Sequence, residues 1–271
     1  MTVTASPITI THHKAKHLRL NFRSRALFFI AFGLAVFAVA PCGQCQTSMS
    51  NPSTPGLMQD GERQLEDGRS SLDEQTLTAA RRVFEECVHR DGKNSLCYYD
   101  LARTDSYLVK AKESQNDRKD AQRWLDSAIE NARRSVALDD RSSDAHALLS
   151  DLYGSKIGYG GMFAGMRYGP KANDEAQRAF QLDANNPRAY VVVGRKYLYS
   201  PKMFGGDLDK AIESFQKAAT IDPHGDEAFV WLAIAYRKKG DEIHAQAAVA
   251  EALRLNSRSV FAKRIRGGVA N

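Results

Sequence analysis

The side chains that most often carry catalysis occur in this sequence without forming a recognised pattern. The histidines of the main body are far apart: His89, His146, His224 and His244. None has the His-Glu-x-x-His spacing that places two zinc ligands on one helix face, and no Gly-x-Ser-x-Gly elbow or Gly-Lys-Ser/Thr phosphate loop is present. We therefore predict a chain that is not an enzyme, with no catalytic residue, no metal site and no cofactor. His146 is predicted to be packed in a core.

The cysteines offer a second possible chemistry. Cys42-Gly43-Gln44-Cys45 has the spacing of a redox motif, but no strand precedes it, and we interpret the spacing as accidental. Cys87 and Cys97 fall at the end of one predicted helix and the start of the next. In an oxidising compartment they would form a disulfide, and the alternative is two packed thiols.

The elements that must position any site follow a repeated pattern. Each unit opens with an aromatic residue or a histidine, followed three and four residues later by an apolar and a small residue. The units read Tyr98-x-x-Leu101-Ala102, His146-x-x-Leu149-Ser150, Tyr190-x-x-Val193-Gly194 and Phe229-x-x-Leu232-Ala233. A second stretch then carries small and bulky residues on one helix face, most clearly in Ala211-x-x-x-Phe215-x-x-Ala218. A partial unit, Ala80-x-x-x-Phe84-x-x-Cys87, precedes them.

This pattern resembles the tetratricopeptide repeat over roughly residues 74–256. The resemblance implies an all-α fold, a right-handed α-solenoid of about four to five helical hairpins. Each hairpin is too small to bury its own apolar face, so stacked neighbours make the core. A first helix containing Leu57, Leu65 and Gly68 would complete the partial unit.

The units are longer than the usual repeat, and the excess lies between the two helices of a hairpin. Successive equivalent positions (Cys87, Ser135, Ala179, Ala218 and Ala252) are 48, 44, 39 and 34 residues apart. The first insertion, 110–119, is charged and is predicted to lengthen both helices. The second, 154–169, contains six glycines, which argue against regular helix there, with Pro170 starting the next helix.

Hairpin loops emerge on one edge of a solenoid, so apolar residues of the second insertion and of the third, 199–206, are expected there. These loop-edge residues are Tyr159, Met162, Phe163, Met166, Met203 and Phe204. They form either an adaptable contact surface or caps that fold back over the hairpin ends.

The resemblance also implies a concave groove lined by the first helix of each hairpin. Carried over to this sequence, the groove-facing residues are Tyr99, Arg103, Tyr107, Asp151, Arg195, Tyr199, Arg237 and Lys238. Arginine and tyrosine are enriched at interfaces and would suit an acidic or extended protein or peptide partner. The alternative is an ordinary solvated face.

The N-terminal 45 residues have a different character. They carry five basic residues and no acidic ones, which leaves 33 basic against 32 acidic residues in 46–271 and gives no reason to expect nucleic-acid binding. Residues 26–40 form an uncharged apolar run, short for a membrane span and typical of a signal peptide or N-terminal anchor. A flexible linker is expected over 46–60 and the repeat domain over 61–271, outside the cytoplasm in the periplasm or cell envelope.

The sequence as a whole favours an exported scaffold that holds a protein partner in its groove. The alternative is a small-ligand-binding repeat protein, an accessory component of an envelope uptake system. In that case Met162, Phe163, Met203 and Phe204 would wall a closed apolar pocket beneath the 154–169 segment.

Overall fold

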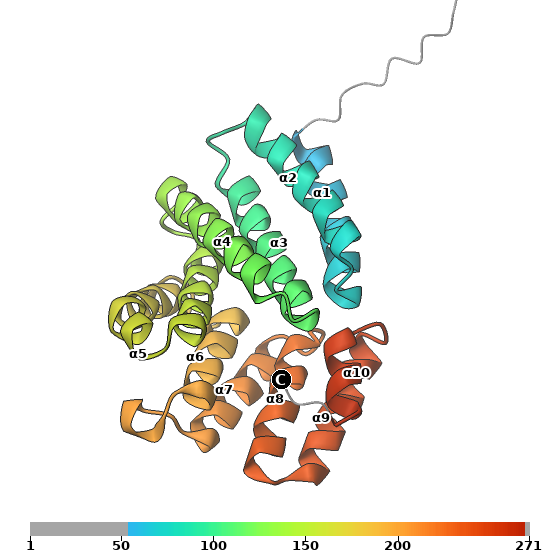
Figure 1. Cartoon of the computed structure of the whole chain (residues 1–271), viewed down its shortest axis with the longest axis vertical. Helices are drawn as coiled ribbons and strands as arrows, with labels where there is room; N and C mark the ends of the chain where they lie inside the picture. Colours follow the sequence, from blue (N-terminus) through green and yellow to red (C-terminus); the bar gives the residue numbers. More distant parts are fainter. Residues whose placement is uncertain (1–53, 269–271) are drawn as a thin grey trace, which may run out of the picture. The chain divides into compact units, whose positions relative to one another are not determined.

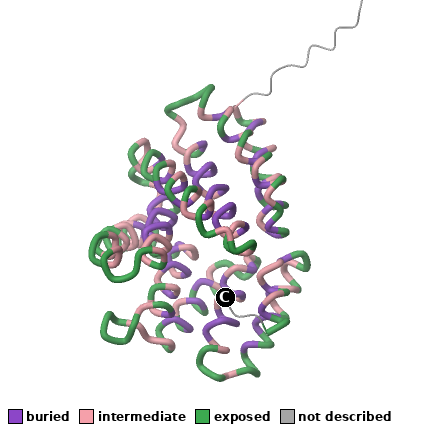
Figure 2. Tube along the Cα trace, in the orientation of Figure 1, coloured by how far each residue is buried: buried purple, intermediate pink, exposed green. Residues whose placement is uncertain are grey.

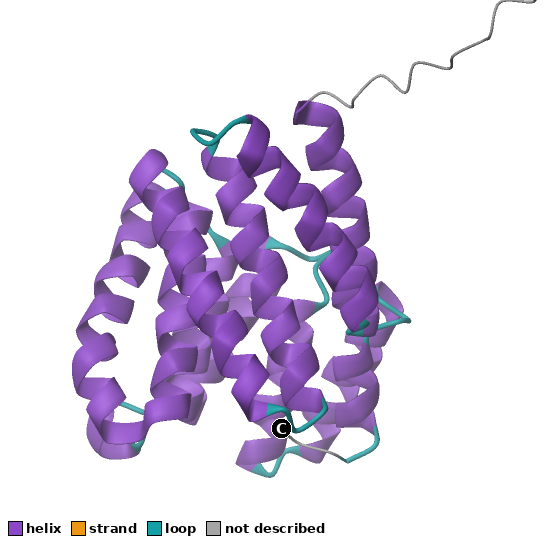
Figure 3. Cartoon of the chain, turned by 45° about the horizontal axis from the view of Figure 1, so that its top comes forward, coloured by secondary structure: helices purple, strands orange, loops and turns teal. Residues whose placement is uncertain are grey.

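The computed structural model describes residues 54–268, and in this range every regular element is helical (Figures 1 and 3). The predicted signal peptide or N-terminal anchor, residues 1–45, lies outside the described residues. The elements are α1 Thr54–Ser71, α2 Glu74–Arg90, α3 Ser95–Ser114, α4 Arg118–Leu138, α5 Ser143–Leu182, α6 Pro187–Tyr199, the 3-10 turn η1 Lys202–Phe204, α7 Leu208–Ile221, α8 Glu227–Lys239, α9 Glu242–Leu255 and α10 Val260–Arg266. Consecutive helices pair as antiparallel hairpins, which confirms the predicted all-α solenoid.

Small residues on the first helix of each hairpin let the second helix approach. In the fourth hairpin, a Cβ built on Gly194 would lie 2.5 Å from Cε1 of the buried Phe215. In the first hairpin, Gly61 meets Phe84 in the same way at 2.6 Å. Leu57 therefore occupies the opening position of the first repeat unit. The helix itself starts at Thr54, so the prediction of a flexible linker over 46–60 was wrong for residues 54–60.

The glycine-rich insertion is helical, contrary to the prediction. Only Gly161 departs from helical geometry, with φ 62° and ψ −144°, and it joins two helices within α5. The two halves fold against each other: the rings of Tyr153 and Tyr168 stack 5.7 Å apart, and the Ser150 hydroxyl donates to the Ala172 carbonyl at 2.7 Å. These contacts offset the poor helix propensity of the glycines. Pro170 lies inside the second half and does not start it.

Two core predictions are settled by the packing. Cys87 and Cys97 form a disulfide that joins the end of α2 to the start of α3, with both side chains fully buried. His146 is buried, and its ring nitrogens lie 2.5 Å from a Glu175 carboxylate oxygen and 3.0 Å from the Asp140 carbonyl oxygen. A histidine satisfied on both nitrogens is a packing residue, as predicted.

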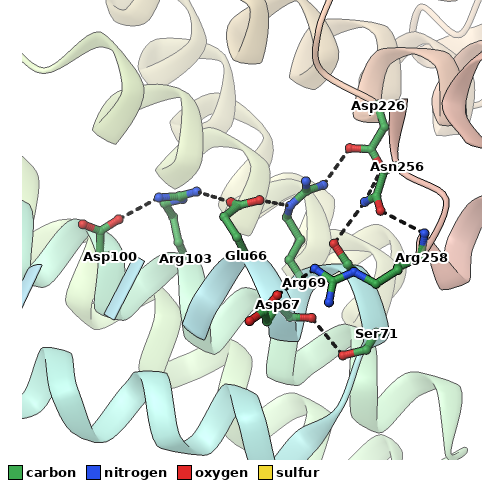
Figure 4. A network of polar contacts seen from close by, with 10 residues as sticks. Glu66, Asp67, Arg69, Ser71, Asp100, Arg103, Asp226, Asn256 and Arg258 are labelled. Carbon is green, nitrogen blue, oxygen red and sulfur yellow. Dashed lines mark hydrogen bonds and ion pairs between the residues drawn. The ribbon is translucent and has the colours of Figure 1, made fainter. Parts of the chain in front are cut away.

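The first and last hairpins of the described chain meet through polar contacts (Figure 4). Arg69 of α1 donates to Asp226, at the start of α8, at 2.8 Å. Asn256, just after α9, donates to both Asp226 and Ser70, at 3.0 and 3.1 Å. Phe261 of α10 packs against the apolar cluster formed by α1, α2 and α3. The solenoid therefore closes on itself instead of ending in two free caps.

Candidate partner-binding site

Four of the eight predicted groove residues, Tyr99, Arg103, Tyr107 and Arg195, belong to one polar and aromatic group. We call this group the inner cluster, and its members are Tyr99, Arg103, Tyr107 and Lys110 of α3, Arg188 and Arg195 of α6, and Glu227 and Trp231 of α8. The carboxylate of Glu227 interacts electrostatically with cations on α3 and α6. Burial opposes its ionisation, but Lys110, Arg188, Arg195 and Arg69 outweigh that effect and hold its pKa at about 2.

Charges in the inner cluster follow the register of the repeat. Five residues after the opening position, the first four hairpins carry Glu62, Arg103, Asp151 and Arg195, with alternating sign. Two residues before the opening position, the third, fourth and fifth hairpins carry Asp144, Arg188 and Glu227, whose charges also alternate in sign. Equivalent positions in stacked repeats are neighbours. Accordingly, Arg195 forms an ion pair with Asp151, and Arg188 Nε lies 3.7 Å from Asp144 Oδ1.

Every arginine of the inner cluster keeps unused hydrogen-bonding capacity. Arg103 donates to Asp100 at 2.8 Å and to Glu66 at 3.5 Å. Yet the buried Nε atoms of Arg103, Arg188 and Arg195 have no hydrogen-bond acceptor among residues 54–268. A guanidinium offers five N–H donors, so each can hold its acidic neighbour and still bind a carbonyl or carboxylate oxygen of another molecule.

Aromatic rings lie beside the cations. The guanidinium carbon of Arg195 lies 4.6 Å from the centre of the Trp231 ring, and that of Arg103 lies 5.6 Å from the Tyr99 ring. Lys110 Nζ lies 4.7 Å from the centre of Tyr107. Burial, followed by the charge of Glu227, raises the pKa of Tyr107 to about 12. Burial also lowers the pKa of Lys110, and Glu227 opposes that shift.

Tyr199, Arg237 and Lys238 lie at the ends of their helices. Tyr199 is about half exposed and meets Trp231 edge-on at 6.2 Å. Arg237 binds Glu242 and the Ile265 carbonyl oxygen, so it holds α8 to α9 and α10. Lys238 donates to the Leu198 carbonyl at 2.7 Å. Arg237 and Lys238 therefore connect neighbouring helices, a role that their place in the last turn of α8 explains.

Sequence reasoning missed Lys110, Arg188, Glu227 and Trp231. A signal for Arg188 and Glu227 was available, because they occupy the same repeat position as Asp144. The acids also change the expected ligand. Around the inner cluster, Asp100, Asp144, Asp151 and Glu227 match its four cations in number, so the net charge there is near zero. Net charge alone gives no preference for an acidic partner.

The loop-edge residues divide into two kinds. Tyr159 folds back: its hydroxyl donates to Glu113 at 2.6 Å, and its carbonyl accepts from Arg118 at 3.2 Å. Met162, Phe163, Met166, Met203 and Phe204 are exposed, by 63% to 83%. The expectation that these five cap the hairpin ends was wrong. Nor do Met162, Phe163, Met203 and Phe204 wall the closed pocket that a small ligand would need.

An open groove of about 900 Å³, which the sequence did not indicate, runs between the end of α5, α6 and α7. Phe180, Tyr190, Val193, Tyr197 and Lys217 line it together with polar side chains of α7. Tyr190 is the opening residue of the fourth hairpin, and Tyr197 lies two turns further along α6. They remain partly exposed here because the second half of α5 buries only Ala179 fully.

Within residues 54–268, no three His, Cys, Asp or Glu side chains lie close enough to hold a metal ion. Over the same range, no helix is long and apolar enough to cross a membrane.

Comparison with known proteins agrees with this fold. A family model described as tetratricopeptide repeat matches residues 203–224. The structure is similar to that of TTC0263, a thermophilic TPR protein in Thermus thermophilus, with a TM-score of 0.60 and 20% identity over 79% of this chain and 98% of that one. Lower scores relate it to YrrB, a TPR protein with an unusual peptide-binding site (0.39, 15% identity, 79% and 92% covered), and to MamA 41-end from Desulfovibrio magneticus RS-1 (0.40, 16%, 76% and 97%). No curated protein matches the chain.

Proposed function

We propose that this chain, whose helical hairpins are similar to tetratricopeptide repeats, is a non-catalytic scaffold that holds an extended segment of a protein partner against the inner cluster. Repeat folds of this kind present extended surfaces built from several hairpins. In this chain α3, α5, α6 and α8 each contribute charged or aromatic side chains to one place.

The observation that carries the proposal is that the guanidinium groups of Arg103, Arg188 and Arg195 meet in one place while their side chains remain 17% to 27% exposed. Their Nε–H groups are closed to solvent, so a partner would bind through the terminal N–H groups. Carbonyl groups on one side of an extended peptide recur about every 7 Å, twice the rise per residue, and can accept from successive guanidinium groups. The half-exposed Tyr199 adds a surface for an apolar side chain.

The balanced charges favour a partner segment of mixed character over a strongly acidic one. An added anion would compete with Asp151 and Glu227 for the same guanidinium groups, whereas a neutral carbonyl would not displace them. We therefore infer that the partner offers carbonyl acceptors and apolar side chains, with no more than one or two carboxylates.

Export to the periplasm or cell envelope is the second part of the proposal. Its support is the apolar run at 26–40 after a basic stretch, together with the buried Cys87–Cys97 disulfide, since disulfides persist mainly in oxidising compartments. Fusion of residues 1–50 to a reporter active only outside the cytoplasm tests this part, and a silent reporter contradicts it.

Partner binding is tested by photocrosslinking in the full chain. A photoreactive amino acid at the half-exposed Tyr199 should capture a discrete partner band, and the same group at Ile243 is the exposed control. Arg188→Gln should weaken the band at least fivefold, because it removes a guanidinium without breaking a short ion pair. Arg254→Gln, which alters only an exposed pair with Glu251, should leave it unchanged. A band equally strong in both variants, with thermal unfolding unaltered, would reject the inner cluster as the site.

A further inference from the structure

Two turns of successive hairpins expose a set of large apolar side chains. We call the set the apolar edge, and it consists of Met162, Phe163 and Met166 on α5 and Met203 and Phe204 on η1. Phe163 is 80% exposed and Met203 83%. Both segments connect the first and second helices of their hairpins, and such connections emerge on the same edge of a solenoid. In Figures 1 and 2, α5 after its kink and the segment after α6 project from the same side of the described body, and Figure 2 colours them mostly exposed or intermediate.

The two chain segments that carry the apolar edge contain only positive formal charges. Residues 152–173 and 196–206 contain five Lys or Arg and no Asp or Glu. Lys156 pairs with Asp126, but none of the ion pairs of the described residues involves Arg167, Lys171 or Lys202. Arg167 and Lys171 instead lie 5.3 and 5.9 Å from the ring of Tyr168.

This combination fits a lipid surface better than a protein surface. The apolar residues stand at projecting turns and do not line a groove, so they are shaped to enter a soft layer. Phe and Met at the tip, tyrosines behind them and basic residues at the sides are the arrangement that binds the headgroup region of a membrane. Negative lipid headgroups supply the charge that the edge lacks. A second copy of the chain would bring the same unpaired cations face to face.

We propose that the apolar edge binds the surface of a membrane that contains anionic lipids, with Phe163 and Met203 reaching the boundary between headgroups and acyl chains. The proposal is independent of partner binding at the inner cluster. It is also independent of the fate of residues 26–40, because it concerns contacts made by the folded repeats.

The test uses the full chain and a probe that reports position. Phe163→Trp and Met203→Trp are mixed with vesicles of phosphatidylcholine containing about a third phosphatidylglycerol, with bromine on the acyl chains as a tryptophan quencher. Leu96→Trp is the matched control. Leu96 is an exposed apolar residue at the start of α3, at the end of the second hairpin that lies away from its turn. Trp124 and Trp231 are partly buried and give the background, measured in the unsubstituted chain.

Tryptophan at 163 and 203 should be quenched by the anionic vesicles and tryptophan at 96 should not. Replacing Arg167, Lys171 and Lys202 together by Gln should raise the lipid concentration needed for half-quenching about a hundredfold, since each basic residue near an anionic surface changes binding about fivefold. Raising the salt concentration should act in the same direction.

Three results would overturn the proposal. One is the absence of quenching at 163 and 203. Another is equal quenching at 96, 163 and 203, which would mean that the chain attaches through its N-terminal segment alone. The third is a vesicle-independent dimer, detected by sedimentation, that Phe163→Ser abolishes.

Discussion

The close approach of Gly194 to Phe215 makes a prediction whose sign can be worked out. Alanine in place of a helical glycine ordinarily stabilises a helix by about 0.5–1 kcal/mol. At Gly194 the added Cβ would lie 2.5, 2.7 and 2.9 Å from three atoms of the Phe215 ring, about 1 Å inside normal contact. Overpacking of this kind costs about 1–3 kcal/mol, because a fully buried ring has no room to move. Gly194→Ala should therefore lower the free energy of unfolding by about 1–2 kcal/mol.

Gly154→Ala is the matched control. Gly154 lies in α5, and a Cβ built there meets no atom within 4 Å. This variant should gain the helix-propensity term alone, about 0.5–1 kcal/mol. Urea denaturation followed by circular dichroism measures both. Adding Phe215→Leu to Gly194→Ala should cost less than the same change in the unsubstituted chain. If Gly194→Ala matches Gly154→Ala in stability, the small-residue explanation of hairpin packing is refuted.

Three further predictions concern the disulfide, the inner cluster and the contact between the ends. Replacing Cys87 and Cys97 by Ala should reduce stability by about 3 kcal/mol from loop entropy, measured by urea denaturation of non-reduced protein. Glu227 is held ionised by its low pKa. Its contribution to the free energy of unfolding, at most about 3 kcal/mol, is present above pH 4.5 and is lost as the pH falls towards 2. Glu227→Gln should flatten that part of the stability–pH curve. Asp226→Ala should cost about 1–3 kcal/mol in thermal unfolding, because it removes a buried carboxylate that accepts from the half-buried Arg69 and Asn256, whereas Arg258→Ala, at an exposed pair, should cost under about 1 kcal/mol.

The sequence predicted the hairpins because packing requires small residues at fixed places. Ala102, Ser150, Gly194 and Ala233 occupy one such place, and all are fully or nearly fully buried. The first hairpin was harder to align, since Leu57 stands where the other units have an aromatic residue or histidine. Only Gly61 keeps the pattern there, and one glycine in a sequence does not define the repeat register. The close approach of Gly61 to Phe84 in the structure defines it.

The α5 segment shows why composition misled. Glycine lowers helix propensity by about 1 kcal/mol per residue, and six in sixteen positions predict a loop. Tertiary contacts decide otherwise: Tyr153 stacks on Tyr168, and Tyr159 is held by Glu113 and Arg118 of the preceding hairpin. Among the six glycines of this segment, Gly161 has a backbone conformation that calls for glycine, because its φ of 62° is rarely open to other residues.

The inner cluster was predicted by residue type but not by pairing. Listing Arg103, Asp151 and Arg195 as separate groove residues treated each side chain as free to meet a ligand. Because they occupy one repeat position in successive hairpins, stacking alone should bring opposite charges together. The ion pair between Asp151 and Arg195 is the result. What no repeat register can indicate is which donors remain unpaired, since that depends on the angle at which each guanidinium meets its partner.

Closure of the solenoid links the inner cluster to the ends of the repeat domain. Glu66 of α1 reaches Arg103, Arg69 contributes to the low pKa of Glu227, and Phe261 of α10 lies 5.6 Å from Lys110 Nζ. Asp226 occupies the N-cap position of α8, yet its carboxylate binds Arg69 and Asn256 instead of the helix N-terminus. A side chain diverted from helix capping to the contact between the ends indicates that this contact is a specific part of the fold. Because α1 and α10 both supply neighbours of the inner cluster, a change that separates the ends should also weaken partner binding. Asp226→Ala should therefore reduce the Tyr199 crosslink, whereas Arg258→Ala should not.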